Sequence, residues 1–228
     1  MKTQAAQACE DRREPDDPFN DQCPVDDVSR KYHSCLQREM ALLRSVNLLR
    51  CEQWHPGGVD DWSVSEWAVA MLGELGELEE AAAACYPTAA AADLEALGAE
   101  LADVLIYLDL LAARLRLPPL GGAEGLSGSL INMEKFMCQR MLGAGLRLGD
   151  TIKKLNRDRD GIGGNVATAC SLQGKVSKEI TFLADSLLTF GRQFDLDLWE
   201  VVVAKFNEVS RRNDLDVFIR PNGGWVRT

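Results

Sequence analysis

The sequence predicts an all-α protein, a helical bundle of about six helices, on three observations. Apolar residues recur at helical spacing in six segments, as on the buried face of an amphipathic helix. Prolines and glycines separate those segments, whereas the period-two alternation typical of strands is scarce. The chain has 228 residues, 46% of them hydrophobic and 26% charged, so it can bury a sizeable core.

The ends of these helices follow from residues that start or stop a helix. Ser63 and Glu66 have the spacing of a capping box, in which two side chains satisfy free N–H groups at a helix start. Asp93 is placed to cap the third helix, and Pro118 lies beyond its end. We expect the six helices at about 28–54, 63–84, 93–117, 130–156, 168–193 and 197–213.

Composition divides the chain into a polar flexible arm, a first half, a glycine-rich linker and a second half. Their ranges are 1–25, 26–119, 120–128 and 129–228. The segment MLGELGEL at 71–78 is similar to MLGAGLRL at 141–148, which indicates a degenerate tandem duplication. The alternative is that leucine-rich helices generally resemble one another.

Charge and cysteine content narrow the class of partner. A net charge of −10 argues against a nucleic acid polymer, but not against a small anion held by local cations or a metal. No apolar run approaches the roughly 20 residues of a membrane span, and the N-terminus lacks the apolar core of a signal peptide. The seven cysteines have no zinc-like spacing and are typical of free thiols in a reducing cytoplasm.

Two neighbouring helices each carry a pair of acids on their apolar face. At about 100° of rotation per residue, Glu74 lies in the middle of the apolar stripe of its helix, with Glu77 beside it. Glu100 and Asp103 have the same relation on the next helix. A short connection predicts that the two helices are antiparallel neighbours, so four carboxylates would converge between them.

Such a group of buried carboxylates needs compensating charge, because the acids repel one another and lose hydration. Divalent cations would supply it, and a ligand set of oxygens without histidine favours Mg²⁺ or Mn²⁺ over zinc. The alternative is neutralisation by lysine or arginine from other helices. By the same rotation, Glu79, Glu80 and Asp109 should point to water.

Cationic residues of the second half are candidates for phosphate binding. Lys205 and Arg212 share an apolar helix face, where they would either bind phosphate or neutralise the acids. Lys154 and Arg157 lie in the basic segment KKLNRDR beside a glycine-rich loop. Their alternative role is that of a solvated helix end, where cations interact favourably with the helix dipole.

Three tryptophans precede or begin the second helix. Trp54 and Trp62 are candidates for stacking on a nucleobase, with packing as the alternative. Trp67 lies on the inward stripe of its helix, so we expect it in the core.

GELGELEEA followed by ELADVLIYLDLLA resembles the ExxE…ExxD pattern of the MazG-like, all-α nucleoside triphosphate pyrophosphohydrolases. KFNEVSRRND resembles the C-terminal Lys-Phe-Asn-x-x-Ser-x-Arg stretch of phage-type members, and RCEQWHPGG with DWSVSEWAVA is also similar to those members. KKLNRDRDGIGGN resembles a loop that follows the first acid pair in single-copy members. Here it follows a second, acid-poor helix. The resemblance covers residues 30–220.

The resemblance implies an enzyme that cleaves a (d)NTP to a (d)NMP and pyrophosphate with Mg²⁺. The matching catalytic metal ligands are Glu74, Glu77, Glu100 and Asp103. The matching phosphate-binding residues are Lys205, Arg212, Asn207, Lys154 and Arg157. The displaced loop leaves the family role of Lys154 and Arg157 open, and Asn207 falls away from Lys205 on the helix.

Phage-type relatives include MazZ-like enzymes that convert dGTP to dGMP, so we lean to dGTP or GTP as substrate, in phage nucleotide metabolism. The alternatives are a dUTP or dCTP diphosphatase, a phosphoribosyl-ATP pyrophosphohydrolase, and a non-catalytic helical module that binds nucleotide with structural Mg²⁺. We expect a cytoplasmic protein (in the host cytoplasm if phage-encoded) that forms a homo-oligomer or an internal pseudo-dimer.

Overall fold

A computed structural model describes residues 25–85, 90–121, 134–161, 166–220 and 222–228. The predicted arm, apart from its last residue, and most of the predicted linker lie outside the described residues. By its internal contacts the chain divides into residues 1–35, which include the beginning of the first helix, and residues 36–228. All contacts described below lie within the second of these units.

The described residues form six helices, as predicted, and a small C-terminal hairpin that the sequence analysis did not predict. The helices are α1 Val25–Trp54, α2 Val64–Ala84, α3 Ala91–Arg114, α4 Glu134–Arg159, α5 Val166–Gln193 and α6 Leu198–Arg212. A short 3₁₀ turn, Gly58–Asp60, lies between α1 and α2. Strands β1 (Val217–Ile219) and β2 (Trp225–Arg227) pair antiparallel. The predicted and observed helix ends differ by only a few residues.

Local hydrogen bonds explain where α2 and α3 begin. Ser63 Oγ accepts from the Glu66 backbone N–H at 3.2 Å, and the Glu66 carboxylate accepts from the Ser63 N–H at 2.7 Å. The predicted capping box is therefore confirmed. Asp93 acts from inside its helix instead, because Ala90 is the N-cap and the Asp93 carboxylate accepts the Ala90 N–H at 2.9 Å. The prediction that Asp93 is the N-cap is wrong by three residues.

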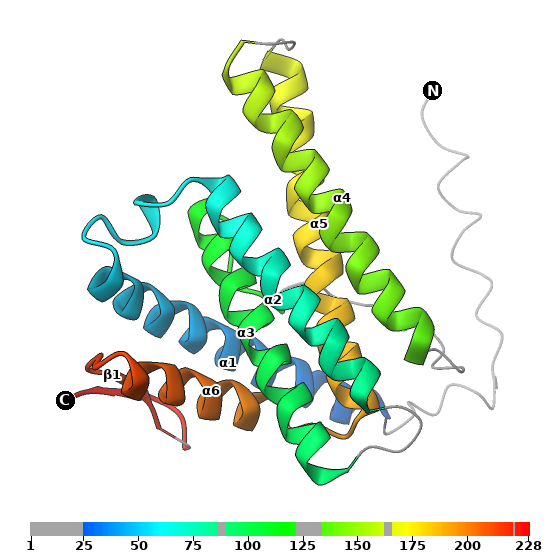
Figure 1. Ribbon diagram of the computed structural model, residues 1–228, viewed down its shortest axis with the longest axis vertical. Helices are drawn as coiled ribbons and strands as arrows, with labels where there is room; N and C mark the ends of the chain where they lie inside the picture. Colours follow the sequence, from blue (N-terminus) through cyan, green and yellow to red (C-terminus); the bar gives the residue numbers. More distant parts are fainter. Residues whose placement is uncertain (1–24, 86–89, 122–133, 162–165, 221) are drawn as a thin grey trace, which may run out of the picture. The chain divides into compact units, whose positions relative to one another are not determined.

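The helices pack as two hairpins laid against each other. α2 packs on α3 and α4 packs on α5, while α2 also contacts α4 and α3 contacts α5 (Figure 1). Gly145 allows the close approach of α2 to α4, because a Cβ atom at Gly145 would lie 2.6 Å from Cδ2 of Leu75. Leu75 and Gly145 hold the same position in MLGELGEL and MLGAGLRL, so the two similar segments meet at equivalent positions.

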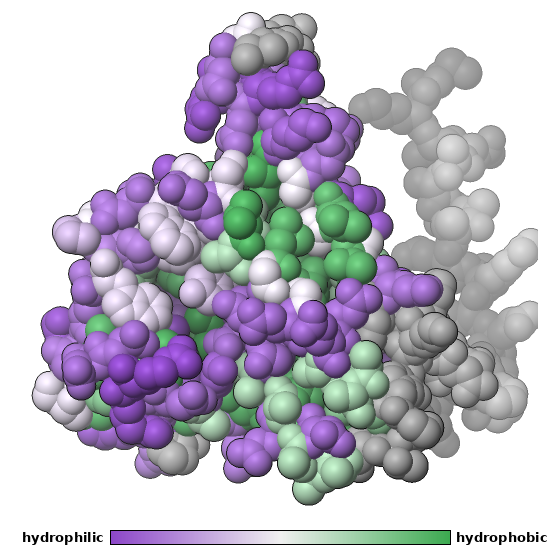
Figure 2. Space-filling view, in the orientation of Figure 1, coloured by the Kyte–Doolittle hydropathy of each residue, from purple (hydrophilic) through white to green (hydrophobic). Residues whose placement is uncertain are grey.

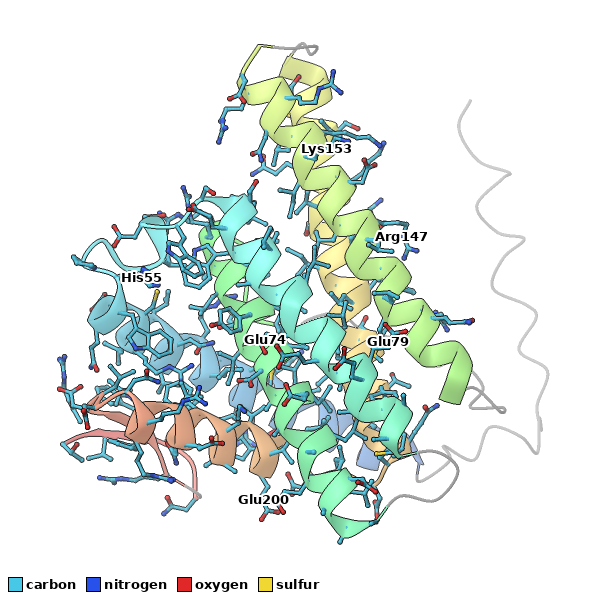
Figure 3. All side chains as sticks on the ribbon, in the orientation of Figure 1. His55, Glu74, Glu79, Arg147, Lys153 and Glu200 are labelled. Carbon is cyan, nitrogen blue, oxygen red and sulfur yellow. The ribbon has the colours of Figure 1, made fainter. Side chains whose placement is uncertain are left out.

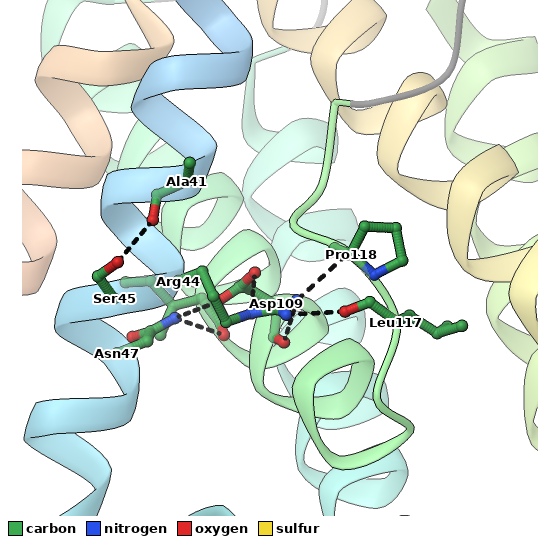
Figure 4. Close-up of polar contacts among 8 residues, drawn as sticks. Ala41, Arg44, Ser45, Asn47, Asp109, Leu117 and Pro118 are labelled. Carbon is green, nitrogen blue, oxygen red and sulfur yellow. Dashed lines mark hydrogen bonds and ion pairs between the residues drawn. The ribbon is translucent and has the colours of Figure 1, made fainter.

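α3 lies at the centre of the core and is buried on nearly all sides. Asp109 is 0% exposed, so the prediction that it points to water is wrong. Its carboxylate accepts hydrogen bonds from Arg44 Nε at 2.9 Å and from Asn47 Nδ2 at 3.2 Å, both on α1 (Figure 4). Arg44 also donates to the Leu117 carbonyl at 2.9 Å. This cluster fixes α1 to α3 and to the chain that leaves α3.

Apolar side chains also reach the surface. Figure 2 shows them gathered over α2 and α4, with hydrophilic residues around them. Val69 of α2 is 70% exposed and Leu146 of α4 is 60% exposed. Among the residues that the structure describes, none of the helices is both long enough and apolar enough to cross a membrane.

Candidate functional site

Three of the four predicted metal ligands converge where α2 faces α3. Glu74, Glu77 and Glu100 each offer one carboxylate oxygen, and these oxygens lie within 4.8 Å of one another. Glu77 lies on the same side of α2 as Glu74, as predicted, but it is exposed, whereas Glu74 and Glu100 are half-buried. The three oxygens are close enough for one cation to bind them all with small side-chain movements.

Asp103 is held by a cation from α6 instead. The distance from Lys205 Nζ to Asp103 Oδ2 is 2.9 Å, and their side chains are only 12% and 14% exposed. This is the predicted alternative in which a cation neutralises an acid, and it applies to Asp103. None of the ion pairs found among the described residues includes Glu74, Glu77 or Glu100.

The electrostatics of the cluster favour a bound positive charge. Burial raises the pKa of Glu74 to about 7, with further contributions from Asp103, Glu77 and Glu100. Burial also raises the pKa of Glu100. Burial by itself lowers the pKa of Lys205, but the hydrogen bond to Asp103 and the surrounding acids raise it overall. A cation between the glutamates would take the place of the proton that Glu74 otherwise binds near neutral pH.

The two faces of α2 differ as predicted. Glu79 and Glu80 are exposed, which confirms that they are solvated charges. Figure 3 shows Glu74 and Glu79 on different sides of α2, with Glu74 turned toward α3. The i,i+3 spacing of Glu74 and Glu77 and the antiparallel course of α3 together bring Glu100 to the same place.

A pocket of about 400 Å³ adjoins this cluster and includes Glu74 and Asp103 in its wall. Five aromatic residues form another part of the wall: Trp54, His55, Trp62, Trp67 and Tyr107. Two arginines also line it, Arg50 from α1 and Arg212 from the end of α6, and the remaining lining residues are Ile106, Leu110, Val209 and Asn213. The pocket therefore combines acids, cations and aromatic rings in one place.

The predicted base-stacking tryptophans lie in the pocket wall. Trp54 and Trp62 both line the pocket. The rings of His55, Trp62 and Trp67 form a cluster with centroid distances of 4.7 to 5.5 Å. Trp67 is 1% exposed and donates its ring N–H to the Val59 carbonyl at 3.0 Å, which confirms its predicted place in the core.

Only some of the predicted phosphate-binding residues reach the pocket. Arg212 lines it and is exposed. Lys205 lies at the acids but is paired with Asp103. Asn207 faces away: its side-chain amide donates to the Ile219 carbonyl and accepts from the Ile219 N–H, both at 2.8 Å. Asn207 therefore attaches β1 to α6, and the structure does not bring it to the site.

Lys154 and Arg157 are also outside the pocket, on the part of α4 that carries their neighbour Lys153. Lys154 pairs with Asp150 one turn earlier at 2.5 Å, and both Lys154 and Arg157 are exposed. Figure 3 shows Lys153 well away from Glu74. Because the pocket is built from α1, α2, α3 and α6, a segment of α4 does not contribute to it. The alternative of a solvated helix end describes these residues.

Among the pocket residues that the sequence did not indicate as site candidates are Arg50, His55 and Tyr107. Tyr107 follows Asp103 by one helical turn, and its place on the same stripe was a usable signal. Arg50 lies on the helix face that carries the buried Val46, so a cation among apolar positions was the corresponding signal. His55 offered no signal beyond its position in the loop after α1.

Comparison of the chain with protein-family models, with curated proteins and with solved structures finds no match in any of the three. The function must therefore be inferred from the fold and from the chemistry of the site.

Proposed function

We propose that this protein is a nucleoside triphosphate pyrophosphohydrolase that depends on a divalent cation and converts a (d)NTP to a (d)NMP and pyrophosphate. The observation that carries the proposal is that Glu74 belongs both to the carboxylate cluster and to the wall of the aromatic pocket. A nucleotide needs both parts, because its phosphates bind cations and its base stacks on aromatic rings.

The donor set fits Mg²⁺ or Mn²⁺. Glu74, Glu77 and Glu100 would hold the ion, and they offer only hard oxygen donors. Such an ion, when bound, would neutralise charge on the phosphates and would polarise a phosphoryl oxygen as a Lewis acid. Asp103, fixed by Lys205, lies next to this group and is placed to accept hydrogen bonds from water or from the ligand.

The other residues of the pocket would bind and orient the nucleotide. Trp54 and Trp62 would stack on the base, and the exposed Arg212 would bind phosphate oxygens at the edge of the pocket. Lys205 would act on the leaving pyrophosphate only indirectly, through Asp103. Orientation of this kind is a large part of catalysis in phosphoryl transfer.

The MazG-like resemblance of the acid motifs supports the same proposal. The contact between Leu75 and Gly145 supports an origin from two fused halves, since related halves would meet at equivalent positions around a two-fold axis. In this view the first half supplies the acids, the second half supplies α6, and the pair forms an internal pseudo-dimer with one site. The enzyme would act in the cytoplasm, that of the host if it is phage-encoded.

The test is to incubate the purified protein with each (d)NTP and Mg²⁺ or Mn²⁺ and to separate the products by ion-exchange chromatography. We expect monophosphate and pyrophosphate, with loss of turnover in Glu74→Gln. Glu79→Gln is the matched control, because Glu79 is exposed on the other face of the same helix. Diphosphate with phosphate as products, or full activity in Glu74→Gln, would refute the proposal.

One observation favours a second candidate, a non-catalytic module that binds nucleotide with a structural cation. Lys205 neutralises Asp103, which leaves three acids rather than four for metal binding. Binding of a triphosphate to such a module would quench its tryptophan fluorescence. The triphosphate itself would stay uncleaved with every metal tested. If the protein cleaves only dCTP, dUTP or phosphoribosyl-ATP, the proposed pyrophosphohydrolase reaction would stand, and the substrate would be one of these nucleotides.

A further inference from the structure

Arg50 is a buried cation in the wall of the aromatic pocket. It is only 2% exposed and belongs to the largest fully buried side chains. The centre of its guanidinium lies 3.8 Å from the ring centroid of Phe206 and 5.0 Å from that of Trp54. The two rings hold the planar group in one orientation beside the pocket.

The protein satisfies this cation only in part. Nη1 donates to the Phe206 carbonyl at 3.0 Å, and Nη2 makes a long contact of 3.5 Å to Asn47 Oδ1. No ion pair within the described part of the chain includes Arg50. A guanidinium has five N–H donors, so about three remain for other acceptors.

A buried charge without a carboxylate partner is unfavourable, and proteins rarely keep one without a use for it. Burial lowers the pKa of Arg50 to about 10, which agrees with its poor compensation, although it stays protonated at neutral pH. Arg50 itself lines the space that a ligand would fill. The ligand therefore needs acceptors that match a flat fork of N–H groups.

We propose that Arg50 reads the edge of a 6-oxopurine base by donating to its O6 and N7 atoms, and that it makes the pocket selective for guanine nucleotides. This inference rests on the proposed function only in that the ligand is a nucleotide. Arg50 is then a specificity-determining residue, whereas Trp54 and Trp62 provide stacking that any base could use.

The burial of Arg50 distinguishes recognition of a base edge from binding of a phosphate. The rigid, buried Arg50 lies among aromatic rings, which suits a flat and weakly hydrated base edge. Arg212 is exposed at the same pocket, which suits a strongly hydrated phosphate.

The donor pattern of the fork separates guanine from the bases that present an amino group in place of O6. Paired donation by arginine to O6 and N7 is the recurrent way in which proteins recognise guanine. Adenine presents an amino group at the position of O6, so it would oppose one donor of Arg50. The amino group of cytosine is likewise a donor, so it would not pair with the Arg50 fork.

The experiment compares kcat/KM for dGTP, dITP, 7-deaza-dGTP and dATP. dITP keeps both O6 and N7, while 7-deaza-dGTP lacks the N7 acceptor. Wild-type protein should use dGTP and dITP similarly and should lose about tenfold or more on 7-deaza-dGTP. Arg50→Lys keeps the charge but lacks the fork, so the loss on 7-deaza-dGTP should shrink to about twofold. Arg116→Lys, at an exposed arginine that pairs with Asp60, is the matched control.

Several results would overturn the inference. Equal losses on all four substrates in Arg50→Lys would make Arg50 a phosphate-binding or structural residue. Equal use of dGTP and 7-deaza-dGTP by the wild type would exclude the N7 contact, and this comparison decides the matter even where Arg50→Lys does not fold. A preference for dCTP would exclude the purine assignment.

Binding without turnover distinguishes failure of this inference from failure of the proposed reaction. Titrations of dGMP and 7-deaza-dGMP, followed by tryptophan fluorescence, need neither cleavage nor a metal. If no triphosphate is cleaved but dGMP binds more tightly than its 7-deaza analogue, and Arg50→Lys removes that difference, the Arg50 assignment holds and the hydrolase is refuted. If dGMP does not bind, the Arg50 assignment is refuted.

Discussion

Replacing Arg44 by methionine should destabilise the fold strongly, because it leaves a buried carboxylate without its cation. Asp109 is fully buried and accepts a hydrogen bond from Arg44 Nε at 2.9 Å. Methionine keeps the length and apolar contacts of the side chain but removes all of its donors. Asn47, the other partner of Asp109, is neutral and contributes one hydrogen bond at 3.2 Å.

The magnitude follows from the protonation of Asp109. Without Arg44 the buried carboxylate can become neutral, and at pH 7 this costs about 4 kcal/mol for a carboxyl with a normal pKa of about 3.9. The Arg44 contact to the Leu117 carbonyl is also lost, for about 1 kcal/mol. We therefore expect a loss of roughly 3 to 5 kcal/mol in the free energy of unfolding at pH 7, as measured for broken buried ion pairs.

The same reasoning sets the pH dependence. Burial raises the pKa of Asp109, so folding favours the protonated carboxyl. This contribution to stability is fully present below the pKa of Asp109 in the unfolded chain, and it is lost as pH rises through its pKa in the folded protein. Loss of Arg44 raises that pKa further, so the destabilisation should shrink to about 2 kcal/mol at pH 4.5, where neutralising the carboxyl costs less. Urea denaturation at both pH values measures it.

Two further variants make the result decisive. Arg44→Met with Asp109→Leu removes both charges and should recover most of the lost stability. Arg116→Met breaks an exposed pair with Asp60 and should cost less than about 1 kcal/mol. A loss below about 1 kcal/mol in Arg44→Met, or the same loss at both pH values, would refute this account of Asp109.

Three other predictions concern the site and the packing. Mn²⁺ affinity, measured by calorimetry, should rise between pH 6 and 8, because the raised pKa of Glu74, about 7, lets protons compete with the metal at the lower pH. Glu74→Gln should remove this rise, and an unchanged pH profile in that variant would contradict the role of Glu74. Gly145→Met should destabilise the fold by about 1 to 3 kcal/mol, because the new side chain would clash with α2. Gly174→Met, at an open position, should instead stabilise the fold by about 0.5 to 1 kcal/mol. Equal effects of the two variants in thermal unfolding would be inconsistent with the α2–α4 contact. Asn207→Ala should lose about 1 to 2 kcal/mol of stability with kcat/KM near the wild-type value, and a selective loss of turnover would instead return Asn207 to the site.

The helices were predictable because their signals are local. Capping residues, prolines and apolar spacing all act within a few residues of one another, so all six helices were placed correctly. The hairpin was not, because strands of three residues are too short to show alternation. Its attachment through Asn207 is a contact between elements, which no local pattern contains.

The site was predictable only up to the faces of single helices. Helical rotation placed Glu74 and Glu100 on inward faces, and both are half-buried. Rotation says nothing about which other helix covers a face. It therefore failed for Asp109, which α1 covers, and it did not show that Glu77 would be exposed although it joins the acid cluster. Lys205, which pairs with Asp103, and Phe206, whose carbonyl accepts from Arg50, come from α6, about 100 or more residues away in the sequence, beyond the reach of any periodic pattern.

Because α6 and the α2–α3 hairpin belong to one polypeptide, their association is a first-order event. Dilution does not separate them, and their ratio is fixed at synthesis. A protein present in only a few copies per cell would keep its pocket assembled, whereas separately made halves would come apart as their concentration fell.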